Sequence, residues 1–201
     1  MWSCLVFLAL LVSDRAPWEL VNEDDSISVW ARQVEDSKIR ELKATTLIPA
    51  PIQRVWDVVM QSAAYTEFMP YVEEIKNMGT SDDGGYYEYQ RIDPPIVDRR
   101  DFTYKVTWQK DEAQGIFIKK WEAANNRGPE LRGDAVRVTT LRGSFTLEKL
   151  DPSITRLTYW LYTDPGGSIP SWVANKANTT SLPDVMRAVR NRSVHPAWKR
   201  Y

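Results

Sequence analysis

The sequence predicts an α+β fold, in which an antiparallel β-sheet carries helices on one side. Three observations indicate this class. Apolar residues recur at helical spacing from Ile52 to Met60. A run of β-favouring segments follows between residues 72 and 163. A second helical pattern closes the chain over residues 169–190. The length of 201 residues suits a single domain with a substantial core.

Two strands are expected before the first helix. Residues 27–31 alternate apolar and polar side chains, and Ile39–Ile48 is rich in β-favouring residues. The prolines at 49 and 51 end the second strand and start the helix, because proline is tolerated in a first helical turn. A short helix through Tyr65 and Phe68 should close before Pro70.

Turn-forming segments separate the later strands. Residues 82–85 have the composition of a hairpin turn, and Pro94–Asp98 is a loop stiffened by proline. The predicted strands are Val72–Met78, Tyr86–Ile92, Phe102–Gln109, Ile116–Glu122, Ala135–Leu150 and Thr155–Thr163. The closing helix, Ile169–Arg190, contains Pro183, which we expect to kink it or split it in two.

Composition excludes several classes of function. The chain has 26 Lys and Arg against 27 Asp and Glu, without a basic run, so no nucleic acid partner is expected. Cys4 is the only cysteine, which rules out an internal disulfide or a cysteine cluster. His195 is the only histidine, which rules out Ser-His-Asp chemistry and sites that need two imidazoles. We therefore expect no metal and no cofactor.

The first residues raise a separate question. Ser3–Val12 is an almost wholly apolar run, too short to span a bilayer and about the length of a signal-peptide core. No Lys or Arg precedes it, and residues 12–16 make a poor cleavage site. The alternatives are an apolar helix packed on the domain or a wrongly assigned start codon. We expect residues 1–17 to be a signal segment of a secreted or periplasmic protein rather than a cytoplasmic one, 18–195 to be the domain, and 196–201 a tail.

One predicted strand has a clear inner face. Phe102, Tyr104, Val106 and Trp108 alternate with polar residues, which places them toward the interior. The preceding strand, Tyr86–Ile92, carries charge on both faces. A buried charge needs a partner.

Candidate partners for these charges lie in the adjacent loop. Glu88 with Arg100, or Arg91 with Asp98 or Asp101, would satisfy them. In one interpretation residues 99–101 only fix the loop onto the sheet. In the other, one pair lies in a cavity and binds the polar end of a ligand.

Two distant segments together resemble a known family. The first is Pro94–Phe102, a proline-stiffened loop that ends in Arg-Asp-aromatic. The second is Asp164–Lys176, a Gly-Gly turn that enters the last helix. In this order and spacing they are similar to the START domain, a lipid-transfer-related module of the helix-grip superfamily, over residues 18–195.

The resemblance implies a helix-grip fold: a curved antiparallel β-sheet wrapped around a long C-terminal α-helix, with an internal apolar cavity. It also implies a binding protein and not an enzyme. Such a protein holds one lipid or similar apolar small molecule, for transfer or sensing, and is a monomer with transient membrane contact. The inner face of the closing helix would lie across the cavity mouth, opposite the Pro94–Asp98 loop, and Gly166-Gly167 would let the helix swing.

The residues expected to bind the ligand come from the helices and the central strands. They are Trp56, Tyr65, Phe68, Glu88, Arg91, Arg100, Phe102, Tyr104, Val106, Trp108, Ile169, Trp172, Val173 and Lys176. In sterol-handling relatives an acid–arginine pair lies in the pocket. Here Glu88 matches the acid, but residues 103–107 lack the arginine, which argues against sterol specificity.

Two alternatives stay open. The chain resembles a superfamily that includes cyclases, aromatases and hydrolases, for which Glu88, Arg91, Tyr104 and Tyr159 are the available proton-transfer groups. A regulatory domain with a collapsed cavity is the other alternative. In that case the interior would be filled by the large rings of Trp56, Trp108, Trp121, Trp160 and Trp172.

Overall fold

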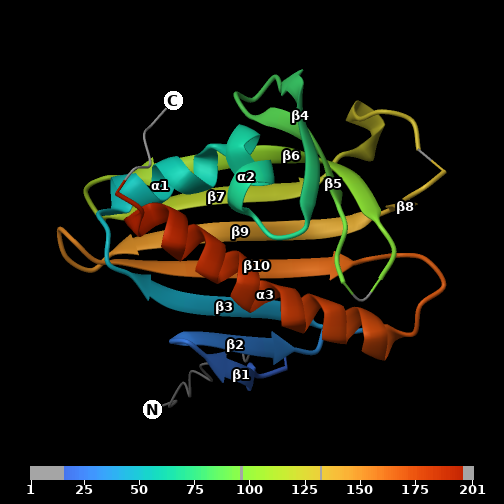
Figure 1. Cartoon of the computed structure of the whole chain (residues 1–201), viewed down its shortest axis with the longest axis horizontal. Helices are drawn as coiled ribbons and strands as arrows, with labels where there is room; N and C mark the ends of the chain where they lie inside the picture. The colour runs from blue at the N-terminus through green and yellow to red at the C-terminus, as the bar shows by residue number, and fades with distance from the viewer. Residues whose placement is uncertain (1–15, 96, 132, 197–201) are drawn as a thin grey trace, which may run out of the picture.

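A computed structural model gives the arrangement of the chain and describes residues 16–95, 97–131 and 133–196 (Figure 1). The apolar run at Ser3–Val12, with Cys4, lies outside the described residues, so the expectation of export stays a prediction.

The described residues form one curved ten-stranded sheet, in the order β1-β2-β3-β10-β9-β7-β6-β5-β4, with β8 paired beside β6. Neighbouring strands run antiparallel, except that β8 is parallel to β6. The strands are β1 (Glu19–Asp24), β2 (Ile27–Arg32), β3 (Glu41–Ile48), β4 (Val72–Thr80), β5 (Tyr86–Ile92), β6 (Arg100–Asp111), β7 (Ile116–Ala123), β8 (Val136–Arg137), β9 (Thr140–Lys149) and β10 (Thr155–Asp164).

The helices lie on one face of this sheet. They are α1 (Ile52–Met60), α2 (Tyr65–Phe68) and α3 (Ser171–Val194), with short 3₁₀ turns at Ser62–Ala64 and Asn125–Arg127. Figure 1 shows α3 running diagonally across the sheet, with α1 and α2 beside it on the same side. The predicted α+β, helix-grip arrangement is confirmed.

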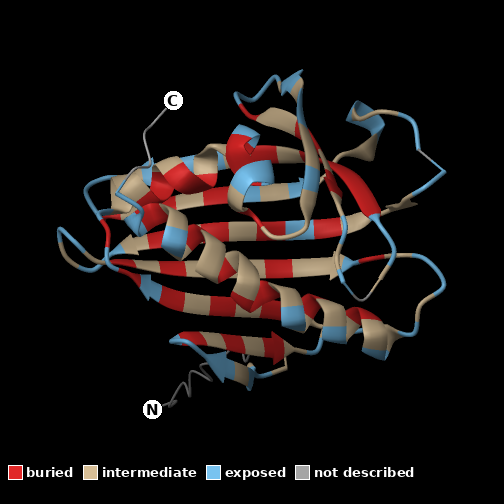
Figure 2. Ribbon diagram, viewed as in Figure 1, coloured by how far each residue is buried: buried red, intermediate tan, exposed pale blue. Residues whose placement is uncertain are grey.

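The core fills the space between the helices and the sheet. In α1 the apolar stripe buries Val55, Val58 and Val59, and Trp56 packs edge-on against Phe117 of β7, with ring centroids 5.5 Å apart. Figure 2 shows buried residues alternating along the central strands, as expected for a sheet with one covered face.

Three elements differ from the prediction. The strand β1 was not predicted, because its side chains are almost all exposed and show no alternation. The segment Ala135–Leu150 is two strands, β8 and β9. The closing helix is uninterrupted through Pro183, which is itself buried beside Leu182, so packing of this helix outweighs the missing backbone donor.

Candidate ligand cavity

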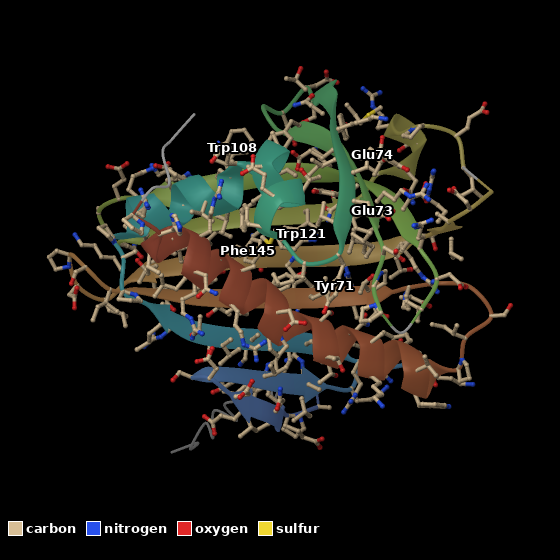
Figure 3. All side chains as sticks on the ribbon, in the orientation of Figure 1. Tyr71, Glu73, Glu74, Trp108, Trp121 and Phe145 are labelled. Atoms are coloured by element: carbon tan, nitrogen blue, oxygen red, sulfur yellow. The ribbon has the colours of Figure 1, made fainter. Side chains whose placement is uncertain are left out.

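A cavity of about 190 Å³ lies between α3 and the concave face of the sheet. Figure 3 shows Trp121 and Phe145 on the sheet and Tyr71 beside α3. The lining is mainly apolar and aromatic. It consists of Tyr65, Met69, Pro70, Tyr71, Val72, Gln90, Ile92, Pro94, Val97, Arg100, Phe102, Tyr104, Lys119, Trp121, Val138, Leu141, Phe145, Tyr159, Leu161, Thr163, Pro165, Ala177, Asn178, Ser181 and Val185.

Three rings form the floor of the cavity. Trp121 lies 5.2 Å from Phe145 and 5.7 Å from Tyr159, and the latter two rings are 4.7 Å apart, measured between centroids. Gly143 is the cross-strand neighbour of Trp121. A β-carbon at position 143 would overlap the indole. The glycine therefore lets the indole lie flat across β9.

The inner end of the cavity, beside α1 and α2, holds a buried lysine. Lys119 is 2% exposed, and its Nζ donates to the backbone oxygen of Val59 at 2.8 Å. The hydroxyl of Tyr65 lies 3.5 Å from the same nitrogen. Burial lowers the pKa of Lys119 to about 8, while the negative charge of Glu88 acts in the opposite direction.

Glu88 forms a network next to this lysine. It is 4% exposed and accepts a hydrogen bond from the Ser62 hydroxyl, and the hydroxyl of Tyr104 lies 3.1 Å from its other oxygen. Gln90 is 3.0 Å from the same Tyr104 hydroxyl. Burial, and then the charge of Glu88, raise the pKa of Tyr104 and of Tyr65, so both phenols stay neutral donors. Glu88 itself does not line the cavity.

The opposite end, which we call the loop end, is bounded by the β5–β6 loop, the β10–α3 turn and α3. Arg100 is 1% exposed and bridges the first two. Its Nε lies 3.2 Å from the oxygen of Pro165, one terminal nitrogen lies 3.3 Å from the oxygen of Gly166, and the other bonds the oxygen of Asp98. Both segments are thus fixed to the first residue of β6.

The turn before α3 depends on two glycines. Gly166 and Gly167 have φ values of 66° and 78°, which side chains with a β-carbon rarely adopt. Tyr71, which also lines the cavity, is joined to α3 by a hydrogen bond from its hydroxyl to Asp184. Burial and this hydrogen bond raise the pKa of Tyr71 to about 12.

The predicted charge pairs are wrong. Arg91 pairs with Glu73 at 3.1 Å and Asp134 at 2.6 Å, and not with Asp98 or Asp101. Glu88 bonds hydroxyls instead of Arg100.

Asp101 also has an unexpected partner. It is fully buried and accepts two bonds from Arg137, at 2.7 and 2.9 Å, and one from Tyr89 at 3.2 Å. Arg137 lies in β8, on the long connection between β7 and β9, whose course no local sequence pattern indicates.

Four of the fourteen residues expected to bind the ligand line the cavity: Tyr65, Arg100, Phe102 and Tyr104. Glu88 lies behind Tyr104. The others lie elsewhere. Trp56 and Val106 are in the apolar core, and Phe68 packs edge-on against Tyr65. Arg91 is held in ion pairs. Ile169 precedes α3, and Val173 and Lys176 lie on α3 outside the cavity lining. Trp108 is 45% exposed and Trp172 is 67% exposed.

The predicted inner face of the closing helix is wrong for most of its residues. Ala177 lines the cavity as expected, but Trp172 and Lys176 point to solvent. The second half of α3 buries the apolar residues Leu182, Met186 and Val189. In the first half the buried residues are Ala174 and Asn178, and the amide of Asn178 donates to the oxygen of Thr163 at 3.0 Å. Small side chains here leave the space that forms the cavity.

Lys119 lines the cavity but is not among the residues predicted from the sequence to bind the ligand. The burial of β7 alternates, so Phe117 and Lys119 share the inner face, and Trp121 also lines the cavity. This alternation along β7 is the sequence pattern that indicates a buried Lys119. A lysine between two inward-facing aromatic rings has to be buried if the strand is regular.

The described residues contain no group of three or more His, Cys, Asp or Glu side chains placed to hold a metal ion. None of their helices has the length and hydropathy needed to cross a membrane.

Comparisons with known proteins agree on one family. The START domain model matches residues 4–199. An uncharacterized protein of Pseudomonas aeruginosa is 29% identical over 87% of this chain and 85% of its own. The phosphatidylcholine transfer protein of Rattus norvegicus is 24% identical over 88% and 85%. A crystal structure of a STAR-related lipid transfer protein fragment from Xanthomonas axonopodis is 30% identical, covers 89% of this chain and 99% of its own, and superposes with a TM-score of 0.78.

Proposed function

The chain belongs to the START domain family, and on that premise we propose that it binds one lipid or similar apolar molecule between α3 and the sheet. The observation that carries the proposal is the cavity itself, which is lined mainly by apolar rings and aliphatic side chains. Burying an acyl chain there stabilises the complex by about 0.8 kcal/mol per methylene group. No bond needs to be made or broken.

The size of the cavity limits what it holds in this conformation. Its volume of about 190 Å³ is below the roughly 300–1,000 Å³ of ordinary ligand pockets. It is slightly above the roughly 150 Å³ of an engineered cavity that binds benzene. A short apolar chain fits directly, and a larger lipid requires the cavity to widen.

Widening is easiest at the loop end. The β5–β6 loop carries Pro94 and Pro95, and the β10–α3 turn carries Gly166 and Gly167 in left-handed conformations. Arg100 hydrogen-bonds both connections, at Asp98 in the first and at Pro165 and Gly166 in the second. We propose that they act as a lid, opening to admit the ligand and closing over it.

Lipid transfer is the role we propose for this binding. Two of the similar proteins carry lipid transfer in their names. Transfer requires transient contact with a membrane, and Trp172 is suited to it. This residue lies on the first turn of α3, between the cavity-lining Pro165 and Ala177 in the sequence, and is 67% exposed. Tryptophan is favoured at membrane–water interfaces.

The alternatives fit the geometry less well. Of the four candidate proton-transfer groups, Tyr104 and Tyr159 line the cavity, whereas Glu88 and Arg91 do not. Burial raises the pKa of both phenols, so neither exchanges its proton readily near neutral pH. A collapsed interior would need the tryptophans to fill it. Only Trp121 of the five candidates lines the cavity, and space remains beside it.

Native mass spectrometry of the purified protein, followed by lipid extraction, tests the proposal. We expect one molecule of an apolar ligand per chain, released on denaturation. Protein that carries no ligand, and takes up none from mixed lipid vesicles, would contradict it.

A further inference from the structure

We infer that the cavity selects a ligand with an oxyanion at one end, a carboxylate or a phosphate, and that Lys119 binds this group. The inference rests on the proposed function and narrows its ligand class. It places the head group at the inner end of the cavity and the apolar chain toward α3 and the loop end.

The charges that line the cavity are all positive. Among its described lining residues, Lys119 and Arg100 are the charged side chains, and none is an Asp or Glu. The nearest acid, Glu88, is turned to Ser62 and Tyr104. The space offered to a ligand therefore carries two cations and no anion, among side chains that are mainly apolar or aromatic with a few neutral polar groups.

Lys119 lacks an ionic partner among the described residues. An ammonium group has three donors. The Lys119 nitrogen contacts two neutral oxygens, the backbone oxygen of Val59 at 2.8 Å and the hydroxyl of Tyr65 at 3.5 Å, and the second distance is long for a hydrogen bond. No described carboxylate lies within 4 Å of its nitrogen. A buried charge without a partner is costly, and a bound oxyanion would remove that cost.

Arg100 is less suited to bind the head group. Each of its three nitrogens already donates to a backbone oxygen of the two segments at the loop end. Turning it toward a ligand would leave those oxygens without their donor. Lys119 is largely protonated at pH 7, because its pKa of about 8 lies above this pH. Its ammonium group is therefore charged and, unlike the Arg100 guanidinium, is free to bind the head group.

Three ligands with the same chain separate the possibilities: decanoate, decyl phosphate and decanol, titrated by calorimetry at pH 7. Wild-type protein should bind at least one of the two anions about tenfold or more tightly than the alcohol. Which anion binds more tightly identifies the head group as carboxylate or phosphate. Equal affinity for decanol and both anions overturns the inference while leaving lipid binding intact.

The variant Lys119→Met replaces the ammonium with an apolar group of similar length. We expect it to lose the preference for anions and to keep its affinity for decanol. The matched control is Lys120→Met, because Lys120 is the exposed neighbour on the same strand. A Lys119→Met protein that keeps the anion preference overturns the inference, as does one that loses all three ligands equally. If wild-type protein binds none of the three, the inference and the proposed function both fail.

Discussion

Arg100 and Pro165 are joined by a hydrogen bond from the guanidinium Nε to the backbone oxygen, 3.2 Å long. The bond connects the start of β6 to the turn that leads into α3. These segments are far apart in the sequence and both line the loop end of the cavity. The contact between them makes Arg100 the residue that holds the proposed lid closed.

Replacing Arg100 with methionine should therefore loosen the lid. The change removes the hydrogen bonds to Pro165, Gly166 and Asp98 but keeps an unbranched apolar side chain in place of the arginine stem. We expect several-fold faster release of a fluorescent fatty acid, measured by stopped-flow, and a free energy of unfolding lower by about 1.5–3 kcal/mol. Arg99→Met is the control, because Arg99 is exposed and its ion pairs are worth about 0–1 kcal/mol. Equal release rates in the two variants would contradict the role of Arg100.

Filling the cavity from α3 should block uptake without unfolding the chain. Ala177 lines the cavity, and Ala177→Trp places an indole in a space of about 190 Å³. Ligand affinity should fall about tenfold or more, while overpacking costs about 1–3 kcal/mol of stability. Lys176→Trp puts the same ring on the exposed side of the same turn and should bind normally. Full uptake by a folded Ala177→Trp protein would show that the ligand lies elsewhere.

Membrane contact should depend on Trp172. Trp172→Ala removes an exposed ring that does not line the cavity. We expect weaker binding to phospholipid vesicles in a sedimentation assay and slower transfer between vesicles. The affinity for a soluble short-chain ligand should not change. The control is Trp108→Ala, an exposed ring on β6 and outside the cavity lining. Vesicle binding that is unchanged in Trp172→Ala, or reduced equally in both variants, speaks against this surface.

Lys119 should make stability depend on pH in the alkaline range. Its pKa is about 8 in the folded chain and 10.5 ordinarily, so the unfolded chain binds more protons between these values. Stability therefore rises with pH in this window, on the order of 2 kcal/mol between pH 7.5 and 9.5. Lys119→Met should lack this rise. Urea unfolding of both proteins at the two pH values measures the difference. An equal change in the free energy of unfolding of the two proteins would mean that the pKa of Lys119 is not lowered in the folded chain.

The sequence was most informative where burial dictates a pattern. The stripe of α1 follows from one apolar face meeting the core, and it appears as predicted. In β6, Phe102, Tyr104 and Val106 are buried as predicted. Thr103 of the same strand is buried as well, and Trp108 is 45% exposed, so the predicted alternation holds only in part. The exposed edge strand β1 has no such pattern and was missed. The inner face of α3 was misassigned because large apolar residues were placed inside. A helix beside a cavity instead presents Ala177, Asn178 and Ser181.

The polar contacts were the least predictable part. The partners of Arg91 and Asp101 are Asp134 and Arg137, which come from the connection between β7 and β9. The position of that connection depends on the whole sheet and not on any local spacing. Lys119 was passed over because lysine in a strand is usually solvated, although the alternation of β7 places it inside.

A crystal structure of the protein with 10-bromodecanoate, in which anomalous scattering locates the bromine, would show directly where the ligand lies. We expect one bromine peak inside the cavity bounded by Trp121, Phe145 and Ala177, with the carboxylate beside Lys119. An empty cavity, with bromine bound only on the outer surface at one equivalent per chain, would contradict this expectation.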